Sequence, residues 1–134
     1  LRLSERAEEA DAVFVRGLAD GLSEVFHNIL DNALKYADNG TAIDVDLETT
    51  DDEAVIAIKN MGPAIPAEQQ ERIFERFYRL DRDGNLRKAG SAGLGLAICK
   101  RTIMGFGGRI WVESPVTGAD KGVIFYVALR RGNS

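Results

Sequence analysis

Hydrophobic side chains recur with a helical period between residues 20 and 37. A step of about 100° per residue gathers the apolar ones on a single arc, which comprises Leu22, Phe26, Ile29, Leu30, Ala33 and Ala37. The opposite arc carries Asn28, Asn32, Lys35 and Tyr36. Asp20 is a candidate N-cap, and Gly40 can end the helix by adopting positive φ. The pattern predicts an amphipathic helix that buries its apolar face.

Several later segments have the pattern of β-strands. Residues 43–48 alternate between apolar and acidic side chains, residues 54–59 are mostly apolar, and a polar stretch separates them. They predict an antiparallel hairpin with one covered face. A short edge strand is expected at the start of residues 1–12, and dense β-branched and aromatic residues predict further strands at 12–16, 109–113 and 123–129.

The segment between the hairpin and residue 109 carries helix and loop signals. Pro66 begins a short helix that runs into residues 73–79. There Phe74, Phe77 and Tyr78 have helical spacing, which favours a place in the core over a ligand platform. Residues 80–91 are polar and typical of a mobile loop, and a glycine-led helix follows at 93–104. We therefore predict an α+β fold, a two-layer sandwich with about three helices on one face of a mixed, mostly antiparallel sheet.

Composition narrows the class of protein. The 134 residues fit one domain, 1–134, and 17 basic against 21 acidic side chains give a net charge of −4. No basic stripe is interleaved with aromatic residues, so nucleic acid is not an expected partner. Cys99 is the only cysteine and is expected to be a buried small hydrophobe, which suits a reducing cytosol. The start at Leu1 suggests a segment cut from a longer chain.

The polar arc of the first helix has the chemistry of a Mg-nucleotide site. Asn28 and Asn32 are spaced i, i+4, so both carboxamides can point oxygens at one hydrated divalent cation. Lys35 can reach a phosphate carried by that cation. An ordinary amphipathic helix with a solvated polar face explains the same pattern equally well.

Two glycine-containing loops add to this picture. Gly93-Leu94-Gly95 opens a helix and offers unpaired N–H groups to a phosphate. Residues 60–66 leave a buried strand with an acceptor side chain beside a glycine, which lets a flat ring approach the backbone. Each loop also has a simpler explanation as a turn.

The order of these segments resembles bacterial sensor histidine kinases. Residues 27–37, 60–66, 72–79 and 90–98 look like the N, G1, F and G2 boxes of that family, and the resemblance covers roughly residues 12–129. It implies a Bergerat-type ATP-binding sandwich that transfers the γ-phosphoryl group of ATP to a histidine on a separate dimerisation domain. A response regulator is the implied downstream partner, and residues 80–92 are the implied ATP lid.

The resemblance also assigns roles by position. Asn32 is the implied Mg²⁺ ligand, and Asn28, Lys35 and Arg79 are the implied catalytic residues, with Arg87 and Lys88 as further candidates to neutralise phosphate charge. Asn60 receives the adenine amino group, Gly62 lets the ring approach, and Tyr36 contacts the nucleoside. The full implied nucleotide-binding set is Asn28, Asn32, Lys35, Tyr36, Asn60, Gly62, Ala64, Ile65, Gly93, Leu94, Gly95 and Leu96.

Three positions depart from the family pattern. Asn60 stands where Asp is most common, so its contact with adenine lacks a formal charge worth about 1 kcal/mol. Ala64 replaces a glycine, which costs about 1–2 kcal/mol if the backbone there needs positive φ. Ser91 replaces another glycine. These departures leave a second hypothesis, a degenerate nucleotide-binding domain that acts as a non-catalytic interaction module.

Two further positions bear on the reaction. ATPases with the same nucleotide fold carry a Glu that activates water at the position of Asn28, and a carboxamide has no usable basic pKa, so transfer is favoured over hydrolysis. His27 is the only histidine and precedes Asn28 directly, so a capping or packing role is expected for it. The acceptor histidine then lies outside this chain. Alone, the chain is expected to be a monomer that binds ATP with little turnover, within a homodimeric kinase in the cytoplasm or at the cytoplasmic side of a membrane.

Overall fold

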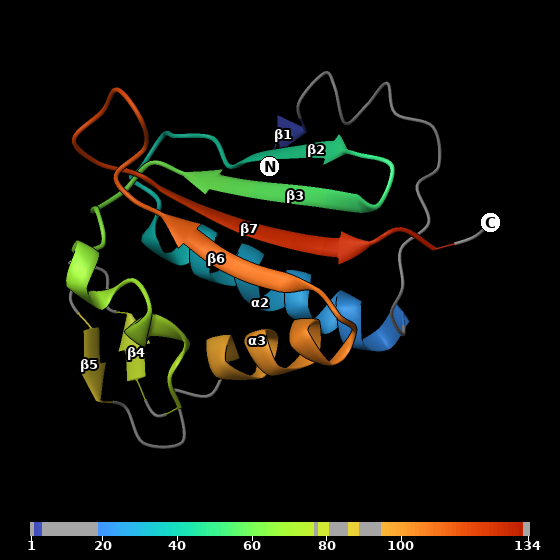
Figure 1. Cartoon of the computed structure of the whole chain (residues 1–134). Coiled ribbons are helices and arrows are strands. Elements are labelled where there is room, and N and C mark those ends of the chain that lie inside the picture. The colour runs from blue at the N-terminus through green and yellow to red at the C-terminus, as the bar shows by residue number, and fades with distance from the viewer. Residues whose placement is uncertain (1, 4–18, 77, 81–85, 89–94, 133–134) are drawn as a thin grey trace.

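The fold is a five-stranded sheet with helices packed on one face (Figure 1). The computed structural model describes residues 2–3, 19–76, 78–80, 86–88 and 95–132. The strands run in the order β1-β2-β3-β7-β6. Their bounds are β1 Arg2–Leu3, β2 Asp44–Thr49, β3 Glu53–Asn60, β6 Arg109–Glu113 and β7 Val123–Arg130.

The sheet is mixed but mostly antiparallel, as the sequence predicts. β2 pairs with β3 as the expected hairpin, and β7 lies antiparallel between β3 and β6. β1 pairs in parallel with β2 and forms the expected edge strand. The α+β class is therefore confirmed. The strand expected at 12–16 lies outside the described residues.

Two α-helices of the described residues, α2 (Ala19–Tyr36) and α3 (Gly95–Gly105), cover one face of the sheet (Figure 1). Val25, Ile29 and Ala33 of α2 are buried with the inner faces of β3 and β7. The remaining apolar-arc residues pack against this core and are partly buried: Leu22, Phe26, Leu30 and Ala37. The apolar arc of α2 is thus confirmed, and no helix of the described residues is long and apolar enough to cross a membrane.

The ends of α2 differ from the prediction. Asp20 lies inside the helix, which already includes Ala19, so its assignment as N-cap is wrong. Gly40 has the expected positive φ of 79°. Tyr36 is only 8% exposed and belongs to the hydrophobic core, so its place on the polar arc is wrong. Its side chain lies in one cluster of buried residues with Ile43, Ile58 and Ile65.

The segment after Pro66 also differs. It forms two short 3₁₀ helices, η1 (Ala67–Gln69) and η2 (Arg72–Phe74), and not one continuous helix. Glu75 is extended, with ψ of 147°, and ends η2. A small antiparallel pair then follows where a helix end and a loop were expected, formed by β4 (Tyr78–Leu80) and β5 (Leu86–Lys88).

Of the three aromatic residues expected in the core, Phe74 is confirmed there. It is 8% exposed and packs edge-on against Phe125, with ring centroids 6.3 Å apart. Tyr78 is half-buried, and its hydroxyl accepts a hydrogen bond from Arg72. Phe77 lies outside the described residues. Helical spacing misled for Tyr78 because this residue begins β4, whereas Phe74 ends the helical turn η2.

A close backbone contact joins the end of α2 to the loop that follows β3. A Cβ atom on Gly62 would lie 2.1 Å from the carbonyl oxygen of Tyr36. Two hydrogen bonds fix the contact, from the Asp38 N–H to the Met61 carbonyl at 2.7 Å and from the Gly122 N–H to the Gly62 carbonyl at 2.8 Å. We call this contact the α2–loop junction. It tolerates only glycine at position 62.

Substitution of Gly62 by alanine tests the junction. The new methyl group meets the Tyr36 carbonyl, so Gly62→Ala is expected to lower the free energy of unfolding by about 2–3 kcal/mol. Gly105→Ala is the matched control, because nothing lies within 4 Å of its added Cβ. Urea denaturation measures both. A Gly62 variant as stable as the Gly105 variant contradicts the account.

Candidate functional site

The polar residues of α2 lie along the side of the helix that remains accessible. Asn28 and Asn32 are half-buried, and Lys35, in the last turn, is exposed. The two carboxamides are one turn apart, so both can address a single ligand. Asp31, which precedes Asn32 directly, is exposed.

Asn28 also contacts α3 through Cys99. The thiol is fully buried and donates a hydrogen bond to the Val25 carbonyl at 3.7 Å. Burial raises the pKa of Cys99 to about 11, a rise that a hydrogen bond with the Asn28 side chain partly offsets. A thiol held neutral in this way is a poor nucleophile. The expectation that Cys99 is a buried packing residue is confirmed.

Asn60 is the buried polar residue of this region. It ends β3, pairs with Val123 across the sheet, and is 2% exposed. Its Nδ2 atom is buried and has no hydrogen-bond partner among the described residues. A buried donor without a partner costs about 1–3 kcal/mol, so a native structure that retains one calls for a physical reason. A ligand acceptor at this position supplies such a reason.

The loop 60–66 is held from the far side by the segment after β6. The Ser114 hydroxyl donates to the Gly122 carbonyl at 2.6 Å and accepts from the Ile65 N–H at 2.9 Å. The Gln70 amide donates to the carbonyls of Ile65 at 3.0 Å and Ser114 at 2.7 Å. Together with the α2–loop junction, these bonds fix the loop on both sides.

Sequence reasoning missed Ser114 and Gln70. Ser114 is 49 residues from Ile65, and Gln70 is 44 residues from Ser114, so no local spacing links them. The one available signal is a hydroxyl residue at the end of a strand, beside a proline and before a turn-rich stretch. That signal marks a turn and does not indicate a partner.

The role of Ser114 can be measured directly. Ser114→Ala leaves the Ile65 N–H and the Gly122 carbonyl without their partner, so the free energy of unfolding is expected to fall by about 1–3 kcal/mol. Amide hydrogen exchange at Ile65 should also accelerate. Ser23→Ala on the exposed side of α2 is the control and should change neither quantity. Unchanged exchange at Ile65 would show that Ser114 does not hold the loop.

The glycine loop is only partly described. Gly95 begins α3, with open space where its Cβ would be, and Leu96 is buried at 8% exposure. Gly93 and Leu94 lie outside the described residues. Arg79 and Arg87 face each other in the register of β4 and β5, next to the pair formed by Tyr78 and Lys88. The backbone therefore brings these three cationic residues together on one hairpin.

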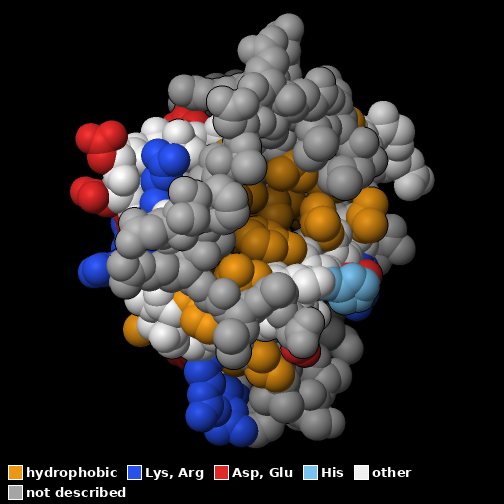
Figure 2. Space-filling model, turned by 90° about the vertical axis from the view of Figure 1, so that its right-hand side faces the viewer, with side chains coloured by type: hydrophobic (Ala, Val, Ile, Leu, Met, Phe, Trp, Pro, Cys, Tyr) orange, Lys and Arg blue, Asp and Glu red, His pale blue; other side chains and the backbone are white. Residues whose placement is uncertain are grey.

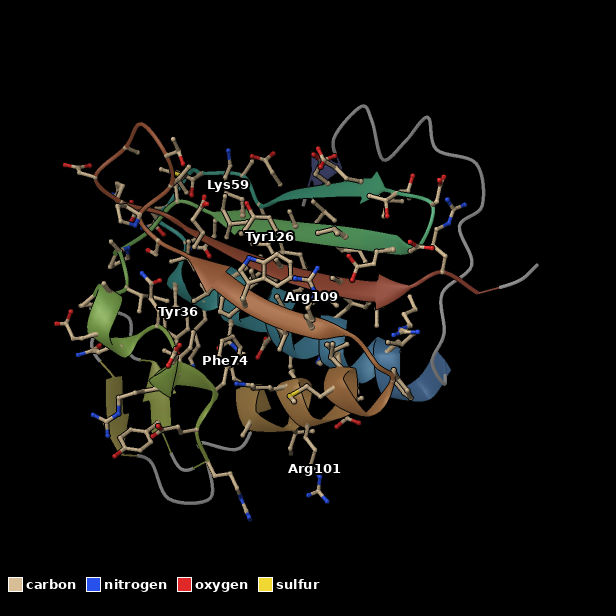
Figure 3. The ribbon with its side chains drawn as sticks, in the orientation of Figure 1. Tyr36, Lys59, Phe74, Arg101, Arg109 and Tyr126 are labelled. Carbon is tan, nitrogen blue, oxygen red and sulfur yellow. The ribbon has the colours of Figure 1, made fainter. Side chains whose placement is uncertain are left out.

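A groove of about 390 Å³ lies on the other face of the sheet. Its lining alternates along the strands with the buried residues and comprises Asp44, Asp46, Glu48, Val55, Ala57, Lys59, Ile124 and Tyr126. Figure 3 shows Lys59 and Tyr126 along the sheet, whereas Tyr36 and Phe74 belong to the hydrophobic core on its helix-covered side. With three carboxylates and one ammonium group the groove repels a triphosphate. None of the candidate residues from the sequence lines it.

His27 lies in the middle of α2 with its side chain exposed. Figure 2 shows the imidazole, in pale blue, at the molecular surface beside a cluster of hydrophobic side chains. The capping or packing role predicted for His27 is therefore wrong. A mid-helix position leaves no terminal N–H group to cap, and the exposed imidazole is not part of the buried core.

The chain is similar to sensor histidine kinases. The family model described as "Histidine kinase-, DNA gyrase B-, and HSP90-like ATPase" matches residues 17–133. "Sensor histidine kinase WalK" of Bacillus subtilis is 35% identical over 122 residues, which covers 82% of this chain and 20% of WalK. The "Sensor protein VanS" of Enterococcus faecium is 44% identical over 100 residues, covering 75% of this chain and 26% of VanS. The chain thus spans about a fifth to a quarter of the length of these relatives.

Solved structures agree with this similarity. The mycobacterial sensor histidine kinase MprB superposes with a TM-score of 0.76 at 31% identity, covering 90% of this chain and 76% of that one. Histidine kinase ThkA in complex with the response regulator protein TrrA has a TM-score of 0.64 at 27% identity, covering 83% of this chain and 28% of that one. The two-layer fold is common to all of them.

Proposed function

Because the chain belongs to the family of histidine kinase-, DNA gyrase B- and HSP90-like ATPases, we propose that it works as the ATP-binding catalytic domain of a sensor histidine kinase. It forms a single domain and transfers the γ-phosphoryl group of ATP to a histidine on a separate dimerisation domain of the same protein. The names of its relatives support this branch of the family over the hydrolases and do not favour a non-catalytic module.

The α2–loop junction is the observation that carries this proposal. It joins α2, which carries Asn32 and Lys35, to the end of β3, which carries Asn60. The contact is between backbone atoms and allows only glycine at position 62. Phosphate-binding and base-binding groups therefore meet at one end of the sheet. A nucleotide with its base at Asn60 and its phosphates along α2 satisfies both sets of groups.

The residues present fit a magnesium ion bound together with the nucleotide. The described residues contain no group of three or more His, Cys, Asp and Glu side chains that could hold a metal. Mg²⁺ usually takes one or two protein oxygens and completes its shell with water and substrate phosphates. The Asn32 carboxamide supplies such an oxygen, with Asn28 one turn away. When bound, the ion neutralises charge on the transferred phosphoryl group.

The other residues of the site position the nucleotide and neutralise the charge on its phosphates. Lys35 is exposed at the end of α2, where its ammonium group reaches a phosphate. Arg79, paired with Arg87 on the β4–β5 hairpin, adds positive charge. Gly93, Leu94, Gly95 and Leu96 enclose the triphosphate at the start of α3. Asn28 cannot serve as a base for water, so the γ-phosphoryl group is kept for an external acceptor.

That acceptor and the downstream partner lie outside this chain. His27 lies on the nucleotide-binding helix itself and cannot come in line with its own phosphate. The acceptor is therefore a histidine of the dimerisation domain, in a kinase that works as a homodimer. A response regulator receives the phosphoryl group next, as the complex of ThkA with TrrA suggests for a similar chain. The domain acts in the cytoplasm.

Calorimetric titration with a non-hydrolysable ATP analogue tests the nucleotide site. Binding should require Mg²⁺, and Asn32→Ala should weaken it by at least about tenfold, since a charge-assisted contact worth about 1.4 kcal/mol is lost. Asp31→Ala is the matched control on the neighbouring exposed position and should leave the affinity within about threefold. Equal weakening by both variants, or tight binding without Mg²⁺, would contradict the assignment of Asn32.

A further inference from the structure

The unpartnered amide of Asn60 carries information about the nucleobase. Its Nδ2 atom is a buried donor without a partner among the described residues, at the end of the loop that receives the base. A carboxamide offers one donor edge and one acceptor edge, whereas a carboxylate offers only acceptors. A base that satisfies Asn60 must therefore present an acceptor next to a donor.

Two kinds of purine have such an edge. Adenine has its 6-amino donor next to the N1 acceptor, so the Asn60 oxygen can accept from the amino group while Nδ2 donates to N1. A 6-oxopurine has the reverse order, with a carbonyl acceptor next to an N1–H donor. A carboxamide turned by 180° about its terminal bond pairs with this edge equally well, because its oxygen and NH₂ group are nearly equal in size.

We propose that this site accepts 6-oxopurine nucleoside triphosphates as well as ATP. The inference rests on the proposed nucleotide site and concerns the base alone. Asn60 determines the breadth of recognition, since a carboxylate at position 60 would face the 6-carbonyl oxygen with no proton between them. A site that is built to hydrogen-bond one group rejects an analogue that leaves buried polar atoms unpaired.

The surroundings of Asn60 fix its backbone, and its side-chain amide nitrogen has no partner among the described residues. The backbone of Asn60 pairs with Val123 in the sheet, and its Nδ2 lies beside Gly62, 3.2 Å from the point where a Cβ of that residue would be. The strand pairing fixes where the residue sits, and a turn of the carboxamide about its terminal bond exchanges the donor and acceptor edges without moving the backbone. Among the described residues, no hydrogen bond commits Nδ2 to a protein acceptor.

Paired titrations of the same chain with Mg²⁺ test the proposal. Inosine 5′-triphosphate is the probe, because it has the 6-oxo edge without the 2-amino group of guanine, and a non-hydrolysable ATP analogue is the reference. The two dissociation constants should agree within about tenfold. Asn60→Asp should raise the preference for the adenine nucleotide by at least about tenfold.

Controls separate this proposal from the one on which it rests. Asn39→Asp introduces the same charge at an exposed turn and should leave the preference unchanged. If the wild-type chain binds the ATP analogue but rejects inosine triphosphate as strongly as Asn60→Asp does, the inference is overturned and the nucleotide site stands. If neither nucleotide binds at millimolar concentration, both proposals fail. Because the decisive comparison uses the wild-type chain, it does not depend on the folding of a variant.

Discussion

The close approach of Gly62 to the Tyr36 carbonyl is the constraint on which the rest of the site depends. It brings the loop after β3 onto the last turn of α2, and the Gly122 N–H ties this loop to the β6–β7 connection. The resemblance to histidine kinases assigns this glycine to the approach of the base. The structure adds a separate steric reason, since a side chain here would part the helix from the strand end that carries Asn60.

Stability and ligand recognition are balanced at Asn60. The residue is 2% exposed, yet its amide nitrogen lacks a partner among the described residues. An apolar residue at the same point would fold at lower cost, because no desolvated donor would remain. The proposed base completes the hydrogen bonds of the Asn60 carboxamide and so offsets this cost. In the absence of the base, Ser114 and Gln70 hold the adjoining loop in place.

Local patterns were sufficient for α2, for the β2–β3 hairpin and for the two C-terminal strands, because each buries one face along a regular repeat. They failed where burial comes from a distant segment. Tyr36 fell on the polar arc but is buried in one cluster with residues of later segments, Ile43 and Ile65 among them. The spacing of Phe74 and Tyr78 is shared by a helix and by a turn followed by a strand. The candidate residues Asn60 and Gly62 came from the order of motifs, whereas the local signal at Ser114 indicates a turn and not its distant partners.

The central claim is that the base of the nucleotide contacts the buried Asn60 amide. The most direct measurement is the nuclear magnetic resonance signal of the Asn60 side-chain NH₂ group during titration with Mg²⁺ and a non-hydrolysable ATP analogue. The account predicts a large downfield shift of one of its two protons as Nδ2 gains an acceptor, with little change at Tyr126 on the outer groove. An unperturbed Asn60 amide at saturating nucleotide would contradict the account.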